Sequence, residues 1–182
     1  MGFDVVGITS TFEPVKSDKI PTVQINVETD RFPYKSNYFD IAIFTEILEH
    51  LYRSPTPVLA EIRRVLKPGG KLIITTPNIT RLVNRLKLLF GYTINQDVEY
   101  FARHQTLDEL YYRHNREYTF WEVKRILIKE NFKVTKSYLF NSYTPFRERG
   151  RRGLAQLARF LYFFVTLLRQ PWQDTIYVEA TK

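Results

Sequence analysis

The sequence contains no cysteine in 182 residues, so disulfides and thiolate metal sites are excluded. It also lacks any apolar run of the ~20 residues that a membrane-spanning helix needs. No basic residue precedes the first apolar run, so we do not expect a signal peptide. These absences suit a reducing compartment, and we expect a cytoplasmic protein with a single domain over residues 1–182.

The whole chain has a net charge of +8, and acidic residues are scarcest in its C-terminal third. Between Arg147 and Arg169 there are six arginines and one acid, Glu148. Such a cluster attracts the phosphates of nucleic acid or of anionic lipid, or it forms a solvated basic face. Nucleic acid is the less favoured of these partners.

The same region, residues 151–169, has the pattern of an amphipathic helix. A helical wheel places Arg152, Gln156, Arg159 and Thr166 on one side and the leucines and phenylalanines on a wide opposite arc. Such a helix lies on a membrane surface, binds a partner, or packs on its own domain. We therefore expect a basic amphipathic insertion at 147–170, with peripheral membrane contact through 151–169 as one outcome.

Strands alternate with helices along the chain, which predicts a three-layer α/β fold with a mostly parallel sheet. Thr56 is expected to cap a helix that has Pro57 at its first position, and Asn78 to cap another. The spacings Thr106-x-x-Glu109 and Thr119-x-x-Glu122 predict capping boxes. The expected strands cover residues 5–8, 22–27, 39–44, 71–76, 132–140 and 175–180, and the expected helices begin near residues 45, 57, 78, 106, 119 and 151.

Two carboxylates and an imidazole follow the strand at 39–44 directly. If a helix begins near Thr45, the side chains of Glu46, Glu49 and His50 share one face, because they stand at i, i+3 and i+4. Two oxygens and a nitrogen suit Mg²⁺ or Mn²⁺. Alternatively, Glu49 and His50 have local structural roles and no metal binds.

Residues 26–78 resemble the class I S-adenosylmethionine-dependent methyltransferases. The matching pieces are the Phe-Pro-Tyr turn at 32–34, "FD" opening the strand at Phe39, "EH" at Glu49, "RVLKPGG" at 64–70 and "TPN" at 76–78. The segment H-x-R-E-Y-T at 114–119 also resembles a piece of this family. The resemblance implies a Rossmann-like methyltransferase sheet and S-adenosylmethionine as cofactor.

In that family the cofactor lies beyond the carboxyl ends of the strands. The resemblance therefore implies the following cofactor-binding positions: Thr9, Asn26, Val27, Phe44, Thr45 and Glu46. However, the sequence lacks the Gly-rich loop of the family's first strand, and Thr9 and Asn26 replace two acidic residues. A missing first strand would leave a gap in the middle of the sheet, which a partner chain or a local rearrangement would fill.

The spacing E-x-x-E-H resembles a metal motif of ubiquinone-biosynthesis O-methyltransferases and of small-RNA 2′-O-methyltransferases, in which a later histidine completes the site. That histidine would be His114 here, or else His104. The resemblance thus implies a metal set of Glu46, Glu49, His50 and His114. Without a metal, His50 and His114 are the catalytic candidates, with His114 as general base or as a structural loop residue.

We therefore expect methylation of an oxygen on a small-molecule, glycan or lipid-linked acceptor. The insertion at 92–118 and the basic amphipathic segment would form the acceptor side. One alternative is a non-catalytic binding or scaffold module, which the missing Gly-rich loop favours. A weaker alternative is metal-dependent RNA 2′-O-methylation.

Overall fold

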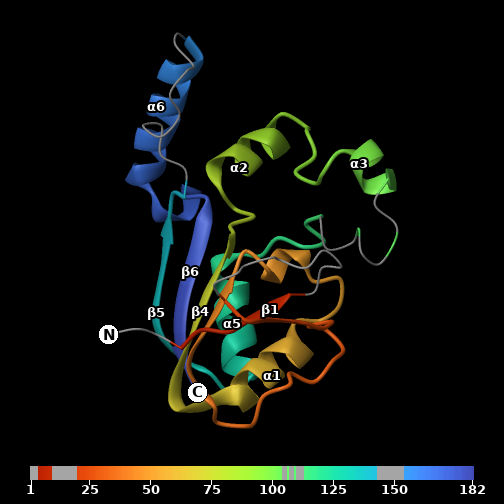
Figure 1. Ribbon diagram of the computed structural model, residues 1–182. Helices are drawn as coiled ribbons and strands as arrows, with labels where there is room; N and C mark the ends of the chain where they lie inside the picture. Colours follow the sequence, from red (N-terminus) through yellow and green to blue (C-terminus); the bar gives the residue numbers. More distant parts are fainter. Residues whose placement is uncertain (1–3, 10–19, 104–105, 107–108, 110–112, 143–153) are drawn as a thin grey trace.

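The structure is a computed structural model that describes residues 4–9, 20–103, 106, 109, 113–142 and 154–182 (Figure 1). It is a mixed α/β fold. The elements in chain order are β1 (Gly7–Thr9), β2 (Thr22–Gln24), β3 (Phe39–Thr45), a 3-10 turn (Leu48–His50), α1 (Thr56–Val65), β4 (Leu66–Pro77), α2 (Leu82–Leu89), α3 (Val98–Arg103), α5 (Phe120–Lys129), β5 (Lys133–Phe140), α6 (Leu154–Leu168), a second 3-10 turn (Gln170–Trp172) and β6 (Thr175–Thr181).

Four strands form the main sheet in the order β3-β4-β6-β5. β3 and β4 are parallel, with Ile43 opposite Ile73, whereas β6 runs antiparallel to both β4 and β5. β1 and β2 form a separate parallel pair. This arrangement confirms the predicted Rossmann-like fold class, with its antiparallel strand near the C-terminus.

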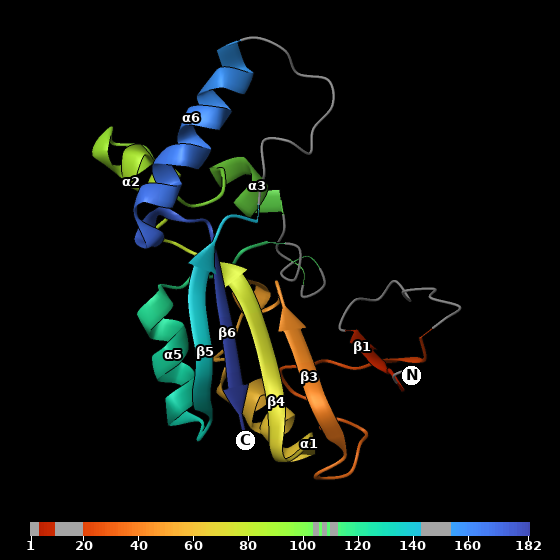
Figure 2. The same cartoon turned by 90° about the vertical axis from the view of Figure 1, so that its left-hand side faces the viewer.

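The hydrophobic core lies between the main sheet and the helices α1 and α5, which both cover the same face of the sheet (Figures 1 and 2). β4 and β6 turn alternate side chains to this face, as the period of a strand requires. Burial of each large apolar side chain stabilises the fold by about 1.5–3 kcal/mol. The best-buried core residues are Leu48, Val58, Leu59, Leu66, Leu72, Ile74, Val123, Leu127, Ile176 and Val178.

The opposite face of the sheet carries no helix in the described part of the chain, as Figure 2 shows. On this face Ile41 and Ile43 are 48% and 70% exposed, and Tyr138 stacks on Tyr177 with ring centroids 4.6 Å apart. Among the described residues β3 pairs only with β4, so its other edge faces no strand. One layer of helices is thus present where a three-layer fold has two.

The first part of β4 depends on two glycines, Gly69 and Gly70. Gly69 has a φ of +75°, a left-handed conformation that L-residues with a side chain rarely adopt. A Cβ at Gly70 would stand 2.8 Å from the carbonyl oxygen of Lys67, so no side chain fits there. The "PGG" segment therefore brings the chain from α1 directly into the sheet.

Three local predictions were wrong. No α-helix begins at Thr45; a 3-10 turn at Leu48–His50 follows β3 instead. α1 begins at Thr56 itself, so the N-cap residue is Pro55 and not Thr56. No side chain caps this end of the helix. α2 begins at Leu82 rather than after Asn78, because the Asn78 side chain is buried and accepts hydrogen bonds from the backbone N–H and the hydroxyl of Thr80.

Both predicted capping boxes are confirmed. Thr119 Oγ1 accepts from the backbone N–H of Glu122, whose carboxylate accepts from the backbone N–H of Thr119. Thr106 and Glu109 make the same reciprocal pair of bonds. The Thr119 box lies at the start of α5. Because α5 packs on the sheet, this box holds the preceding segment in place.

Candidate functional site

The site begins where β3 ends, at a residue with an unusual backbone conformation. Glu46 has a φ of +53°, which is uncommon for a residue other than glycine. Two hydrogen bonds hold it: its backbone N–H donates to the carbonyl oxygen of Thr75, and its Oε1 accepts from Thr75 Oγ1 at 2.7 Å. The chain therefore turns sharply, and Glu46 does not share a helical face with Glu49.

Glu49 is a buried carboxylate, with only 1% of its surface exposed. Its Oε2 accepts a hydrogen bond of 2.8 Å from the hydroxyl of Thr76, at the end of β4. Burial raises the pKa of Glu49 above its ordinary value, because removal from water disfavours the charged form. A cation beside this carboxylate would stabilise the ionised form.

His50 is oriented by the segment that precedes α5. Its Nδ1 lies 3.1 Å from the carbonyl oxygen of Arg113. A carbonyl oxygen can only accept, so Nδ1 carries the hydrogen and donates it. In the neutral ring Nε2 then keeps its lone pair, and it lies 3.8 Å from Glu49 Oε1. The segment is docked by Asn115, whose side chain donates to the carbonyl oxygen of His50 at 2.8 Å.

His114 is held in the same way on the other side of Glu49. Its Nδ1 donates to Glu117 Oε1 at 3.3 Å, and this bond raises the pKa of His114 above its ordinary value. Burial opposes ionisation of Glu117, but His114 and the guanidinium of Arg81 outweigh it and lower the pKa of Glu117. Arg81 lies 3.0 Å from the same carboxylate oxygen.

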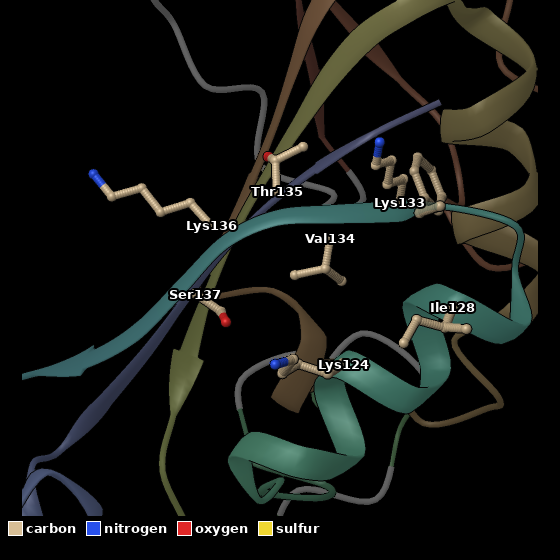
Figure 3. A pocket seen from close by; sticks show the side chains of 8 residues that line it. Lys124, Ile128, Lys133, Val134, Thr135, Lys136 and Ser137 are labelled. Atoms are coloured by element: carbon tan, nitrogen blue, oxygen red, sulfur yellow. The ribbon is translucent and has the colours of Figure 1, made fainter.

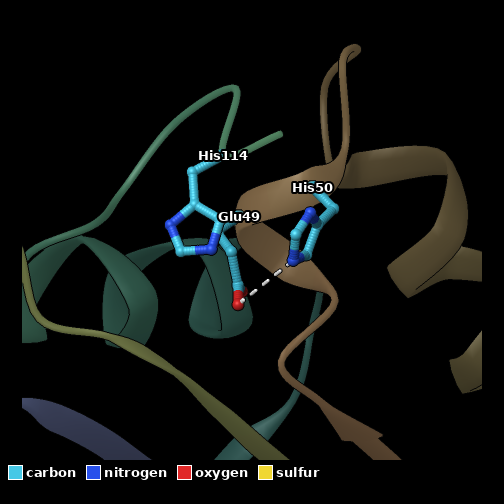
Figure 4. Close-up of side chains that lie close together, drawn as sticks. All are labelled: Glu49, His50 and His114. Carbon is cyan, nitrogen blue, oxygen red and sulfur yellow. Dashed lines mark ion pairs between the residues drawn. The ribbon is translucent and has the colours of Figure 1, made fainter. Parts of the chain in front are cut away.

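Glu49, His50 and His114 form one cluster, in which a ligand atom of each lies within 4.8 Å of the others (Figure 4). The two imidazole rings meet edge to face, with their centroids 4.8 Å apart. Three of the four predicted metal residues are therefore brought together and Glu46 is not, because its carboxylate bonds Thr75. His104, the second choice for the late histidine, lies outside the described residues.

The predicted cofactor positions lie in two groups, one at the ends of β1 and β2 and the other at the end of β3. Thr9 ends β1, and Asn26 and Val27 follow β2, where the Asn26 side chain accepts from the backbone N–H of Glu28. Thr45 and Glu46 end β3, whereas the Phe44 side chain is buried in the core, so only its backbone could line a pocket. No strand in the described ranges joins the two groups.

S-adenosylmethionine therefore fits this chain only in part. The residues after β2 and β3 could form one wall of its site, but the described residues contain no Gly-rich turn to form the wall opposite. No step of a reaction can be derived through the cofactor from these residues alone.

The sequence reasoning missed the residues that orient the cluster. These are Thr76, which holds Glu49, and Glu117 and Arg81, which hold His114. The spacing His114-x-x-Glu117 in the H-x-R-E-Y-T segment was an available signal, but the position of Arg81 depends on how the chain folds back onto that segment.

A separate hollow lies between α5 and the start of β5, away from the cluster (Figure 3). Its lining includes the stems of Lys124 and Lys133 beside Ile128 and Val134, and it has no carboxylate or imidazole. It therefore offers neither of the side-chain types that form the Glu49 cluster.

The N-terminal part of the chain is similar to known proteins. Residues 2–74 match the family described as "Methyltransferase domain". An uncharacterised 37.1 kDa protein in transposon TN4556 of Streptomyces fradiae is 32% identical over 80 residues, which are 41% of this chain and 23% of that protein. An uncharacterised protein of Methanocaldococcus jannaschii is 31% identical over 81 residues, which are 44% of this chain and 35% of that protein. The chain thus matches about a quarter to a third of the length of these relatives.

Solved structures share the fold at low sequence identity. A SAM-dependent methyltransferase from Archaeoglobus fulgidus aligns with a TM-score of 0.61 and 15% identity, over 97% of this chain and 75% of that one. SAM-dependent methyltransferases from Methanosarcina mazei align with a TM-score of 0.56 and 15% identity, over 98% and 81%. A putative methyltransferase of Haloferax volcanii, solved in complex with the Trm112 methyltransferase activator, aligns with a TM-score of 0.56 and 12% identity, over 91% and 62%. The chain thus contains a segment that matches the methyltransferase-domain family, and it shares the fold of S-adenosylmethionine-dependent methyltransferases.

Proposed function

We propose that the chain is the acceptor-side part of an O-methyltransferase and that Glu49, His50 and His114 hold a divalent cation at its site. The observation that carries this proposal is the cluster itself: a buried carboxylate and two imidazoles converge at the carboxyl end of the parallel strands. In an open α/β sheet this end is where ligands bind. A cation there would bind an acceptor hydroxyl and ease its loss of a proton.

The hydrogen bonds around the two histidines support a cation. In metal sites a ligating histidine commonly donates its other ring N–H to a carbonyl or carboxylate. Arg113 and Glu117 provide these two acceptors, which leaves each Nε2 with a lone pair. Two lone pairs and one carboxylate make a set with one negative charge, which suits Mn²⁺ or another ion that accepts nitrogen and oxygen.

The distances suit an ion after a small adjustment. Bonds of about 2.0–2.2 Å place two ligands of one ion at most about 4.4 Å apart. The 3.8 Å between Glu49 Oε1 and His50 Nε2 lies within this limit. The 4.8 Å bound on the whole cluster exceeds it slightly, so a small rotation of one side chain would complete the set.

Without an ion, the same cluster would act as a general base. His50 Nε2 would then accept the proton of the acceptor hydroxyl. The two versions differ in a measurable way, because only the first requires a divalent cation. The RNA-methylation alternative loses support, because Glu46 is absent from the cluster.

The donor side would be completed by a further parallel strand that pairs with the free edge of β3. The observation that supports this is that β3 has no second partner strand among the described residues. A partner chain would be one source of the strand, since a Haloferax volcanii protein of this fold was solved in complex with an activator.

The second candidate function is a non-catalytic binding module, which the open edge and the missing Gly-rich turn favour. Calorimetric titration with S-adenosylhomocysteine separates the two. With one wall of the site present, we expect a dissociation constant near 1 mM, about 4 kcal/mol. Binding that weakens when Asn26 is changed to Ala supports the methyltransferase. No binding at millimolar ligand would favour the binding module.

A further inference from the structure

The side of α6 that carries Thr166 faces the domain. Thr166, which the helical wheel places on the polar side, is fully buried and accepts a hydrogen bond of 2.8 Å from Asn141 Nδ2. One turn earlier, the hydroxyl of Tyr162 hydrogen-bonds with the backbone of Val83 in the first turn of α2. The polar atoms of Tyr162 and Thr166 thus attach α6 to the domain.

Attachment through these residues leaves an apolar stripe exposed. Leu157, Leu161, Phe164 and Leu168 stand at i, i+4, i+7 and i+11, so they follow one side of the helix. Their side chains are 56%, 58%, 56% and 78% exposed. A continuous exposed apolar stripe on a globular protein marks a contact surface rather than ordinary surface.

The segments that form α2 and α6 contain basic residues and no acidic residue. Residues 79–96, which include α2, and residues 154–173, which include α6, contain no Asp or Glu. The first segment carries Arg85 and Lys87, and the second carries Arg169; all three are exposed. An exposed apolar stripe in a positively charged region of the chain complements a surface that is apolar inside and negatively charged outside.

We propose that α6 docks on the surface of an anionic lipid bilayer, with Leu157, Leu161, Phe164 and Leu168 inserted among the acyl chains near the headgroups. None of the helices in the described part of the chain is long and apolar enough to cross a membrane, so α6 would lie along the surface. Arg85, Lys87 and Arg169 would face the phosphates.

The position of α6 gives this contact a consequence for the site. α6 projects from the end of the sheet at which β3, β4 and β5 finish (Figure 2), and the Glu49 cluster lies at that same end. A bilayer on the stripe would therefore lie on the acceptor side of the molecule. Lipid binding rests on no part of the proposed chemistry, so either can fail without the other.

Vesicle co-sedimentation tests the proposal with the 182-residue chain. We expect binding to vesicles of equal parts phosphatidylcholine and phosphatidylglycerol, much weaker binding to phosphatidylcholine alone, and loss of binding at high salt. The double change Leu161→Glu and Phe164→Glu should weaken binding by about tenfold or more, because two inserted apolar groups are lost. Ile128→Glu on α5, at a side chain that is 60% exposed, is the matched control and should bind like the wild type.

Two further measurements make the result decisive. Thermal unfolding of the double variant should match the wild type, because both side chains are already exposed. Analytical ultracentrifugation without lipid should show a monomer. Equal binding to neutral and anionic vesicles, equal loss in the Ile128 control, or a lipid-free dimer that the double change dissociates would overturn the proposal; the last result would assign the stripe to a second copy of the chain.

Discussion

Glu49 and His50 are neighbours in sequence, and their side chains also converge, with Oε1 and Nε2 3.8 Å apart. The 3-10 turn makes this convergence possible, and each residue has its own fixed partner: Thr76 for the carboxylate and the Arg113 carbonyl for the imidazole. Because both partners hold the outer atoms, the inner oxygen and nitrogen face a common point. An ion or an acceptor proton at that point would meet both.

Substitutions on the two faces of β3 should differ greatly in how much they lower the free energy of unfolding. Phe44 is 5% exposed in the core, so Phe44→Ala should lower the free energy of unfolding by about 3–5 kcal/mol. Ile43 is 70% exposed, so Ile43→Thr in the isolated chain should change it by no more than about 0.5 kcal/mol. Urea unfolding measures both. A large loss for Ile43→Thr would show that this face is already covered, for example by a second copy.

Two of the threonines that were expected to cap helices, Thr119 and Thr56, should differ in how much their replacement lowers the free energy of unfolding. Thr119 accepts the first-turn N–H of Glu122, so Thr119→Ala should lower the free energy of unfolding by about 1 kcal/mol. Thr56 is an exposed first residue of α1, so Thr56→Ala should cost less than about 0.5 kcal/mol. Equal losses in denaturant unfolding would mean that the assigned start of α1 is wrong.

These threonines illustrate how far the sequence predicts the structure. The Thr119 box was predictable because both partners lie within three residues of each other. The six strands were predictable for a similar local reason, since apolar runs bounded by turn residues mark them. Glu46 was not predictable, because its left-handed backbone depends on two bonds to Thr75, 29 residues later.

The candidate site, too, could be predicted only where the signal is local in the sequence. Glu49, His50 and His114 could be named from spacing and resemblance, but their convergence depends on the contacts of Asn115 and Glu117. The wheel for α6 identified the apolar arc, but it left open which side of the helix faces the domain. A pattern of polarity does not reveal that Asn141 will bury Thr166.

The lowered pKa of Glu61 predicts that the stability of the fold depends on pH. Hydrogen bonds from Arg64, with a smaller contribution from the backbone N–H of Phe32, lower the pKa of Glu61 below its ordinary value of 4.5. The ionised form is therefore favoured by folding. Its stabilisation, about 1 kcal/mol for a partly exposed group, is complete above about pH 4.5 and is lost as the pH falls through the folded-state pKa.

The change Glu61→Gln isolates this contribution. Above about pH 4.5 the variant should be less stable than the wild type, and the gap between their free energies of unfolding should close at lower pH. Urea titrations at a series of pH values measure the gap. A gap that widens on acidification would have the wrong sign for a carboxylate with a lowered pKa.

Thermal unfolding with added Mn²⁺ tests the central claim, because the chain offers a matched pair of carboxylates. Glu49 belongs to the cluster and Glu46 bonds Thr75 instead. In chelator-treated protein, Mn²⁺ at about a hundred times its dissociation constant should raise the free energy of unfolding of the wild type and of Glu46→Gln by about 2.7 kcal/mol, and leave Glu49→Gln unchanged. No stabilisation of the wild type, or the same stabilisation of all three proteins, would contradict a cation site formed by Glu49, His50 and His114.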